Sequence, residues 1–133
     1  MIVVDTNLIV YFYMFGEYTE LAAQVYAKEP VWIAPYLWRS EFRNTSLFYL
    51  RKGLLTLPQL LQISEAAEIM MHDNEFHVPT SEILQLASTS SCSAYDCEFV
   101  ALAQECGVPL ITADKKVLSA FPNVALSPAQ FIA

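Results

Sequence analysis

Glycine and positive charge are both scarce in this 133-residue chain. Its 3 glycines exclude collagen-like repeats, and none of them forms the glycine-rich loop of dinucleotide-binding or P-loop folds. Only 7 residues are basic against 14 acidic ones, for a net charge of −7. Proteins that hold nucleic acid through extensive phosphate contacts are usually basic. The acidity therefore favours a cation-binding cleft or a basic protein partner.

Long apolar runs and paired cysteines are also missing. The longest stretch without a charged residue, Val117–Ala133, contains two prolines, whereas a membrane-spanning helix needs about 20 mostly apolar residues. Asp5 interrupts the apolar start of the chain, so we expect no secretory signal. The 3 cysteines lack CxxC spacing. We expect reduced thiols in a cytoplasmic protein that does not enter a membrane.

Apolar side chains, in contrast, are abundant, at 55% of residues against about 45–50% in typical soluble chains. This content excludes disorder, and the length predicts one domain over residues 1–133. The segment Leu47–Ile63 is dense in Leu, Phe and Tyr, more than two helices of a small domain need to bury. We expect a second copy or a partner to cover part of it.

Short apolar runs alternate with amphipathic segments along the whole chain. The runs predict strands over Ile2–Asp5, Val31–Ala34, Phe76–Val78, Val108–Thr112 and Asn123–Leu126. Helices are predicted over Thr6–Tyr13, Glu17–Lys28, Pro35–Lys52, Thr56–His72, Thr80–Ser88, Ser93–Cys106 and Lys115–Phe121, with Pro35 in a first helical turn. This alternation predicts the α/β class, as a three-layer α/β/α domain with a central, mostly parallel sheet. Sites in such sheets gather at the carboxyl ends of the strands.

Two of the predicted strands end in an acid. Ile2-Val3-Val4 runs into Asp5, and Leu110-Ile111-Thr112 is followed two residues later by Asp114. Because the carboxyl ends of parallel strands meet at one edge of a sheet, both carboxylates are expected there. Each could equally be a helix N-cap or the first residue of an Asx-turn, where Asp is favoured.

Asp96 lies inside the predicted helix Ser93–Cys106, and Phe99, Val100 and Ala103 share its face at helical spacing. An unpaired carboxylate on an apolar face is costly. The alternative is a capping box in which Ser93 is the N-cap and Asp96 its third-position partner. Glu98, on the side of Leu102 and Glu105, is predicted to face solvent.

Glu41 is a second acid on an apolar helical stripe, which it shares with Leu37 and Phe48. A carboxylate there needs a partner, and a salt bridge with Arg39 or Arg43 would supply one. Taken together, however, the four acids suggest a common explanation. Clustered carboxylates repel one another unless a cation neutralises them, and oxygen ligands suit Mg²⁺ or Mn²⁺. Such ions activate water and stabilise phosphoryl displacement.

The motifs around these acids resemble those of the PIN domain family. They are Asp5-Thr6-Asn7 after the first strand, Ser-Glu-Phe-Arg-Asn around Glu41, Ala-Tyr-Asp-Cys-Glu-Phe-Val-Ala-Leu-Ala around Asp96, and Thr112-Ala113-Asp114 after a late strand. The length and the full coverage are most similar to stand-alone VapC-type toxins of toxin–antitoxin pairs. One departure from the pattern is Cys97, where the family more often has a small residue such as Ala; Cys packs as a small hydrophobe.

This resemblance implies a Mg²⁺- or Mn²⁺-dependent endoribonuclease with Asp5, Glu41, Asp96 and Asp114 as its acidic quartet. Asp5 and Asp96 would be direct metal ligands, and Asn7 and Thr112 match the small polar positions that orient such acids. The resemblance also implies a homodimer and a co-expressed antitoxin that binds the active-site groove. Arg39, Arg43 and Lys115 are candidates for contact with the phosphates of RNA, although each could simply be a solvated surface residue.

Two rival interpretations remain at this point. A phosphoacceptor receiver domain also has an acidic, Mg²⁺-binding pocket at strand ends, but it needs paired acids after its first strand and a Lys at the end of a late one. Here Asp5 stands alone before Thr6 and Asn7, and Lys115 follows an acid. The other rival is a PIN-like protein that has lost catalysis and serves only as a binding partner.

Overall fold

Five parallel strands form the centre of the computed structural model, which describes all 133 residues. They are β1 (Ile2–Val4), β2 (Trp32–Pro35), β3 (Glu75–Phe76), β4 (Leu110–Ile111) and β5 (Ala125–Leu126). Their order across the sheet is β3-β2-β1-β4-β5, and every neighbouring pair is parallel. The predicted α/β class and parallel sheet are confirmed, with strand ends displaced by one or two residues.

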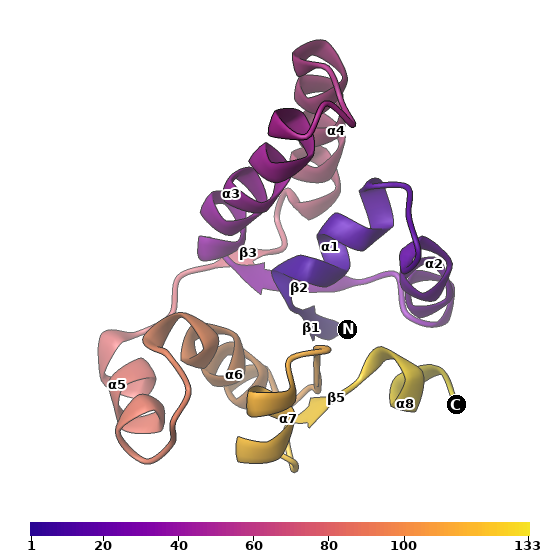
Figure 1. The fold of residues 1–133 in the computed structure, drawn as a ribbon. Coiled ribbons are helices and arrows are strands. Elements are labelled where there is room, and N and C mark those ends of the chain that lie inside the picture. The colour runs from indigo at the N-terminus through magenta and orange to yellow at the C-terminus, as the bar shows by residue number, and fades with distance from the viewer.

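Eight helices cover the sheet. They are α1 (Thr6–Tyr13), α2 (Thr19–Lys28), α3 (Leu37–Arg51), α4 (Leu57–Met71), α5 (Thr80–Ser88), α6 (Ala94–Cys106), α7 (Lys115–Ala120) and α8 (Pro128–Ile132). Figure 1 shows α1, α3 and α4 on one side of the sheet and α5, α6 and α7 on the other, which gives the three layers. None of the helices is long and apolar enough to cross a membrane.

Local signals explain why most of these helices begin and end where they do. Capping boxes start α4 at Thr56 and α6 at Ser93, and Gly107 ends α6 in the left-handed conformation, with φ of 64°. Such caps pair the backbone groups that the first and last helical turns leave free. A third capping box at Ser127, followed by Pro128, starts α8, a short helix that the hydrophobic pattern did not predict.

The prediction that Pro35 occupies the first turn of a helix is wrong. Pro35 is the last residue of β2 and pairs with Phe76, and α3 begins two residues later. The N–H groups of Ala34 and Tyr36 bond to carbonyl oxygens beside and within β3, so the nitrogen of Pro35 faces β1 instead. Because β1 ends at Val4, the missing N–H falls at the end of the ladder, where proline is tolerated.

The order of the strands positions the site. The chain proceeds outward from β1 to β2 and β3, then returns to place β4 on the other side of β1. In parallel sheets, ligands bind at the carboxyl ends of the two strands between which this reversal occurs. Asp5 directly follows β1, and its N–H donates to the carbonyl of Ile111 at 3.1 Å. Asp114 follows β4, so both acids lie at this switch point.

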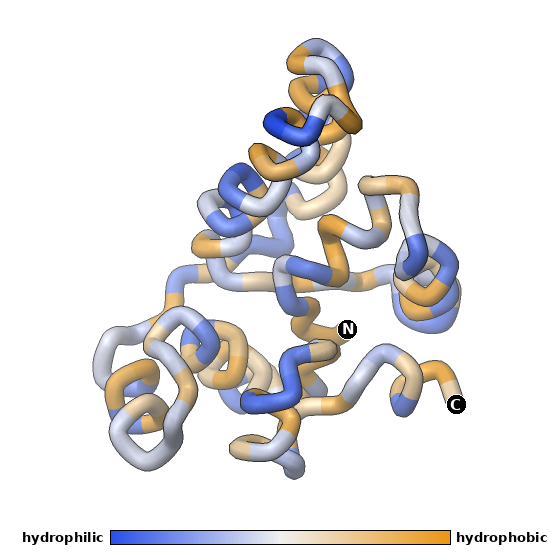
Figure 2. Tube along the Cα trace, viewed as in Figure 1, coloured by the Kyte–Doolittle hydropathy of each residue, from blue (hydrophilic) through white to orange (hydrophobic).

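The paired helices α3 and α4 extend beyond the sheet (Figure 1). They and the turn between them leave apolar side chains exposed. Figure 2 shows hydrophobic residues along the strands and again on this projecting pair. The exposed members are Phe48, Leu54, Leu57, Leu61 and Ile69, each more than half exposed. The prediction that Leu47–Ile63 contains more apolar side chains than the core can bury is therefore confirmed.

Candidate active site

One pocket of about 220 Å³ brings the four predicted acids together. Its walls come from segments that are far apart in the sequence: the start of α1, the middle of α3, the first turn of α6 and the loop after β4. The polar side chains that line it are Asp5, Thr6, Asn7, Glu41, Thr45, Asp96, Thr112 and Asp114. The pocket lies at the carboxyl edge of β1 and β4, the edge expected from the sequence.

Asp5 is held at the centre of this arrangement. It is the N-cap of α1, and one oxygen accepts the Asn7 N–H at 2.6 Å while the other accepts the Thr112 hydroxyl at 2.5 Å. Burial raises the pKa of Asp5 above its ordinary value, against the lowering effect of these two bonds, and the nearby carboxylates of Asp114 and Asp96 raise it further. Thr112 thus contacts the Asp5 carboxylate through its side chain, whereas Asn7 contacts it through its backbone.

Glu41 is not paired with any positive charge, so its predicted alternative as a salt-bridge partner of Arg39 or Arg43 is wrong. Its Oε1 instead accepts a hydrogen bond from the Thr6 hydroxyl at 2.8 Å. Burial raises the pKa of Glu41, and the charge of Asp5 adds to this effect. Sequence analysis did not single out Thr6, although it stands inside the Asp5-Thr6-Asn7 motif.

Asp96 and Asp114 each cap the start of a helix and also line the pocket. Asp96 completes the predicted capping box, its N–H donating to Ser93 Oγ at 3.0 Å and its Oδ2 accepting the Ser93 N–H at 3.4 Å. Asp114 is the N-cap of α7, where its Oδ1 accepts the Val117 N–H at 3.1 Å. Each carboxylate keeps one oxygen without a hydrogen-bond partner in the protein. The capping interpretation and the functional one are therefore compatible.

The donor set of the pocket fits a hard divalent cation. Its polar lining consists of carboxylates, hydroxyls and one carboxamide, with no thiol or imidazole, and oxygen donors of this kind suit Mg²⁺ or Mn²⁺. No three acidic, histidine or cysteine side chains are already arranged around a common ion. Glu41, Asp96 and Asp114 each have one carboxylate oxygen without a hydrogen-bond partner in the protein, which could bind such an ion.

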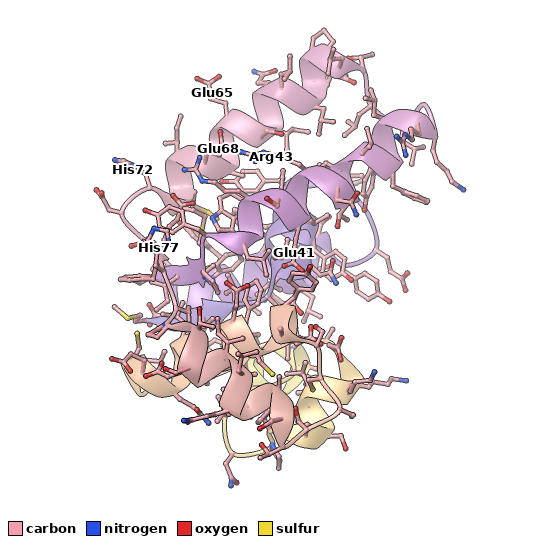
Figure 3. The ribbon with its side chains drawn as sticks, turned by 90° about the vertical axis from the view of Figure 1, so that its left-hand side faces the viewer. Glu41, Arg43, Glu65, Glu68, His72 and His77 are labelled. Atoms are coloured by element: carbon pink, nitrogen blue, oxygen red, sulfur yellow. The ribbon has the colours of Figure 1, made fainter.

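The arginines predicted to contact phosphate lie elsewhere. Figure 3 shows Arg43 and Glu68 between α3 and α4, whereas Glu41 lies on the opposite side of α3. The Arg39 guanidinium bonds to both oxygens of Glu75, at 2.5 and 2.8 Å, and to Glu68 at 3.0 Å. Residues two positions apart on a helix face away from each other, so neither Arg39 nor Arg43 shares the face of Glu41. Neither arginine therefore lines the pocket, and their contact with RNA phosphate stays a prediction.

Three further residues lie at or near the pocket: Lys115, which was predicted to contact RNA, and Thr45 and Glu98, which were not predicted for the site. Lys115 is exposed directly after Asp114, which leaves it free to meet an anion at the pocket. Thr45 lines the pocket one turn after Glu41. Glu98, predicted to face solvent, is half-buried and near enough to Glu41 to raise its pKa. The prediction that the side of α6 with Glu98 and Leu102 faces solvent was wrong, since Leu102 is buried.

Comparison with known proteins identifies the family. No curated protein sequence matches this chain. The fold is similar to the crystal structure of PAE2754 from Pyrobaculum aerophilum, with a TM-score of 0.77 and 15% identity over 98% of this chain and 92% of that one. It is also similar to the structure of FitAcB from Neisseria gonorrhoeae, with a TM-score of 0.71 and 17% identity over 97% and 99%. The model of the PIN domain matches residues 2–125, so the chain belongs to the PIN domain family, whose members are generally nucleases that use divalent metals.

Proposed function

We propose that this chain is a metal-dependent endoribonuclease that cleaves RNA phosphodiester bonds. The observation that supports it is the gathering of four carboxylates, from four separate segments, in one pocket at the switch point of the sheet. Burial raises the pKa of Asp5 and of Glu41, and no protein cation lies against either of them. A folded protein that leaves such charges uncompensated is arranged to receive a cation.

Each side chain of the pocket has a distinct task in this proposal. Asp5, Glu41, Asp96 and Asp114 would hold Mg²⁺ or Mn²⁺, which when bound activates water and neutralises charge on the phosphate. Thr112 and the Asn7 N–H fix the Asp5 carboxylate, and Thr6 fixes Glu41. Such supporting bonds set the orientation of ligating carboxylates. Lys115, which is exposed directly after Asp114, would contact a phosphate of the RNA.

We further propose that the chain is the toxin of a type II toxin–antitoxin pair and acts in the cytoplasm. Family membership supports this role, and so do two surface properties. The net charge of −7 favours a basic antitoxin partner. The exposed side chains of α4 and of the turn before it, including Leu54, Leu57 and Leu61, provide apolar area for a homodimer or for that antitoxin.

The decisive test of the nuclease is cleavage of single-stranded RNA by the purified chain. We expect cleavage with Mn²⁺ or Mg²⁺, loss of cleavage in EDTA, and loss in Asp5→Asn. Glu65→Gln, which removes an exposed acid of α4 far from the pocket, is the matched control and should cleave as the wild type does. A wild-type chain that binds the metal but cleaves no RNA would instead support the non-catalytic PIN-like alternative.

The toxin role has its own tests. A small reading frame adjacent to this gene that encodes a basic DNA-binding protein would support it, and that protein should form a complex with the chain and inhibit cleavage. Size-exclusion chromatography at micromolar concentration tests the homodimer, since a monomer in the absence of antitoxin would contradict it. The receiver-like alternative is set aside, because the family match covers residues 2–125 and PIN domains are generally nucleases.

A further inference from the structure

An aromatic stack at the carboxyl edge of the sheet has no evident role in the core. The rings of Tyr36 and His77 have centroids 4.5 Å apart and planes inclined at 31°. Both side chains are exposed, Tyr36 to 43%, and neither belongs to the hydrophobic core or packs on it. Burial of apolar surface therefore explains little of this pairing, because the stabilisation scales with the area removed from water.

The register of the sheet places this stack at the same edge as the acids. Tyr36 is the first residue after β2 and His77 the first after β3, and the Tyr36 N–H donates to the carbonyl of Phe76 at 3.1 Å. Asp5 directly follows β1, which pairs with β2, and the register puts Asp5 level with Pro35, one residue before Tyr36. Adjacent strands lie about 4.8 Å apart. The backbone of Tyr36 is thus one strand, and that of His77 two strands, from β1 and its Asp5.

Helix α3 connects the stack to the pocket. It begins immediately after Tyr36 and brings Glu41 to the pocket about one and a half turns later. Figure 3 shows His77 near the first turn of α3, with Glu41 further along the same helix and Arg43 on its opposite side. An extended polymer whose cleaved bond lies at the carboxylates can therefore reach the two rings with a neighbouring unit.

The chemistry of the two rings suits an unpaired nucleobase. Single-stranded RNA is recognised by stacking its bases on aromatic side chains, Tyr and His among them, and this stacking needs no positive charge. That property matters in a chain with only 7 basic residues, of which Arg39 is bonded to Glu75 and Glu68. Stacking can provide affinity that phosphate contacts do not.

We propose that Tyr36 and His77 form a platform on which an unpaired base stacks while the adjoining phosphodiester lies at the acidic pocket. The inference rests on the proposed ribonuclease function and assigns two residues that would hold an unpaired base of its RNA substrate. Duplex RNA, whose bases are already stacked on one another, should bind more weakly.

The test measures binding of a short fluorescent single-stranded RNA to the Asp5→Asn chain and, as a second background, to the wild type in EDTA. In both, Tyr36→Ala should weaken binding about 5- to 100-fold, the range for loss of one stacked base. Tyr36→Phe, which keeps the ring, should bind as its parent does. Phe15→Ala, which removes a side chain that is 98% exposed and unstacked, is the matched control and should have no effect.

A spectroscopic measurement separates stacking from a merely structural role. An RNA that carries 2-aminopurine should lose fluorescence on binding to the parent and to Tyr36→Phe, and should keep it on binding to Tyr36→Ala. If the wild type cleaves RNA but Tyr36→Ala binds and quenches equally, the platform is wrong and the nuclease stands. Platform-dependent binding without any cleavage would support the platform and overturn the nuclease, and absence of both would overturn both. If Tyr36→Ala weakens only binding of a protein partner, the stack is a protein contact and the base platform is wrong.

Discussion

Helix α3 separates two groups of carboxylates that the protein treats in opposite ways. On one side, Glu75 and Glu68 bond to Arg39, and Glu75 also accepts the Trp38 indole N–H at 2.7 Å. On the other side, Glu41 shares its pocket with further acids and has no cationic partner. The first group is neutralised from within the chain and joins α3, α4 and β3. The second is left to be neutralised by something the chain does not supply.

The pKa shifts of the two groups have opposite signs for the same reason. Hydrogen bonds from Arg39 lower the pKa of Glu75, whose side chain is only 3% exposed, and the Glu75 carboxylate in turn raises the pKa of Arg39. Burial and neighbouring acids raise the pKa of Asp5 and Glu41. A charge that is satisfied internally stabilises the fold, whereas a charge that is not satisfied marks a site.

The largest effect that this comparison predicts is on catalysis. Asp5→Asn should lower metal-dependent RNA cleavage by about 100-fold or more, because even partners that only support a metal ligand are worth about 10- to 100-fold. Rates of cleavage with Mn²⁺ would be measured beside those of Glu75→Gln, assayed at a temperature where that variant is folded. Glu75→Gln should remain active, since its partners lie outside the pocket. Equal loss in both variants would contradict the division into two groups.

The free energy of unfolding should depend more on Glu75 than on the acids of the pocket. Glu75→Gln should lower the free energy of unfolding by about 3 kcal/mol, the loss typical of a buried ion pair with one partner removed. Glu41→Gln should change it by less than about 1 kcal/mol in metal-free buffer, because it removes a charge that has no ionic partner. Urea unfolding in EDTA, followed by circular dichroism, measures both. A larger loss in Glu41→Gln than in Glu75→Gln would show that the pocket acid is structural.

A bound divalent metal ion should stabilise the fold only when the acids of the pocket are present to bind it. An ion present at 100 times its dissociation constant adds about 2.7 kcal/mol to the free energy of unfolding, so Mn²⁺ should raise the melting temperature of the wild type and of Glu75→Gln. The increase should be much smaller in Asp5→Asn. Thermal melts with and without Mn²⁺ provide this measurement, and an equal increase in all three proteins would mean that the ion binds elsewhere.

The smallest predicted effect is the pH dependence of the metal-free fold. Glu75 has a lowered folded pKa, so its stabilisation is present above the ordinary carboxyl pKa and is lost as pH falls through the folded value. Asp5 has a raised folded pKa, so it destabilises the fold at neutral pH, and this cost disappears as pH falls toward its unfolded value. Urea unfolding in EDTA, carried from neutral pH to well below the ordinary carboxyl pKa, should show that Asp5→Asn reduces the gain on mild acidification and that Glu75→Gln flattens the acid loss. No change in either variant would contradict these assignments.

Local sequence signals were sufficient for most secondary structure. Capping residues such as Thr56 and Ser93, and the glycine at 107, act over three or four residues, so they can be recognised without the fold. Signals that depend on distant pairing could not be recognised. Pro35 is in a strand and pairs with Phe76 of the distant β3. Glu98 is half-buried and lies near enough to Glu41 of α3 to raise its pKa.

For the site, the sequence alone determined which acids would meet: a strand-end Asp is directed to the carboxyl edge by the geometry of a parallel sheet, and the family motifs added Glu41 and Asp96. Which cations stay free was decided by the tertiary structure. Arg39 lies two residues from Glu41, yet the helical repeat turns it to the opposite face, where Glu75 from β3 neutralises it. The sequence determines which residues carry a charge. The tertiary structure determines which charges pair, because the groups that meet in space come from segments that are distant in the chain.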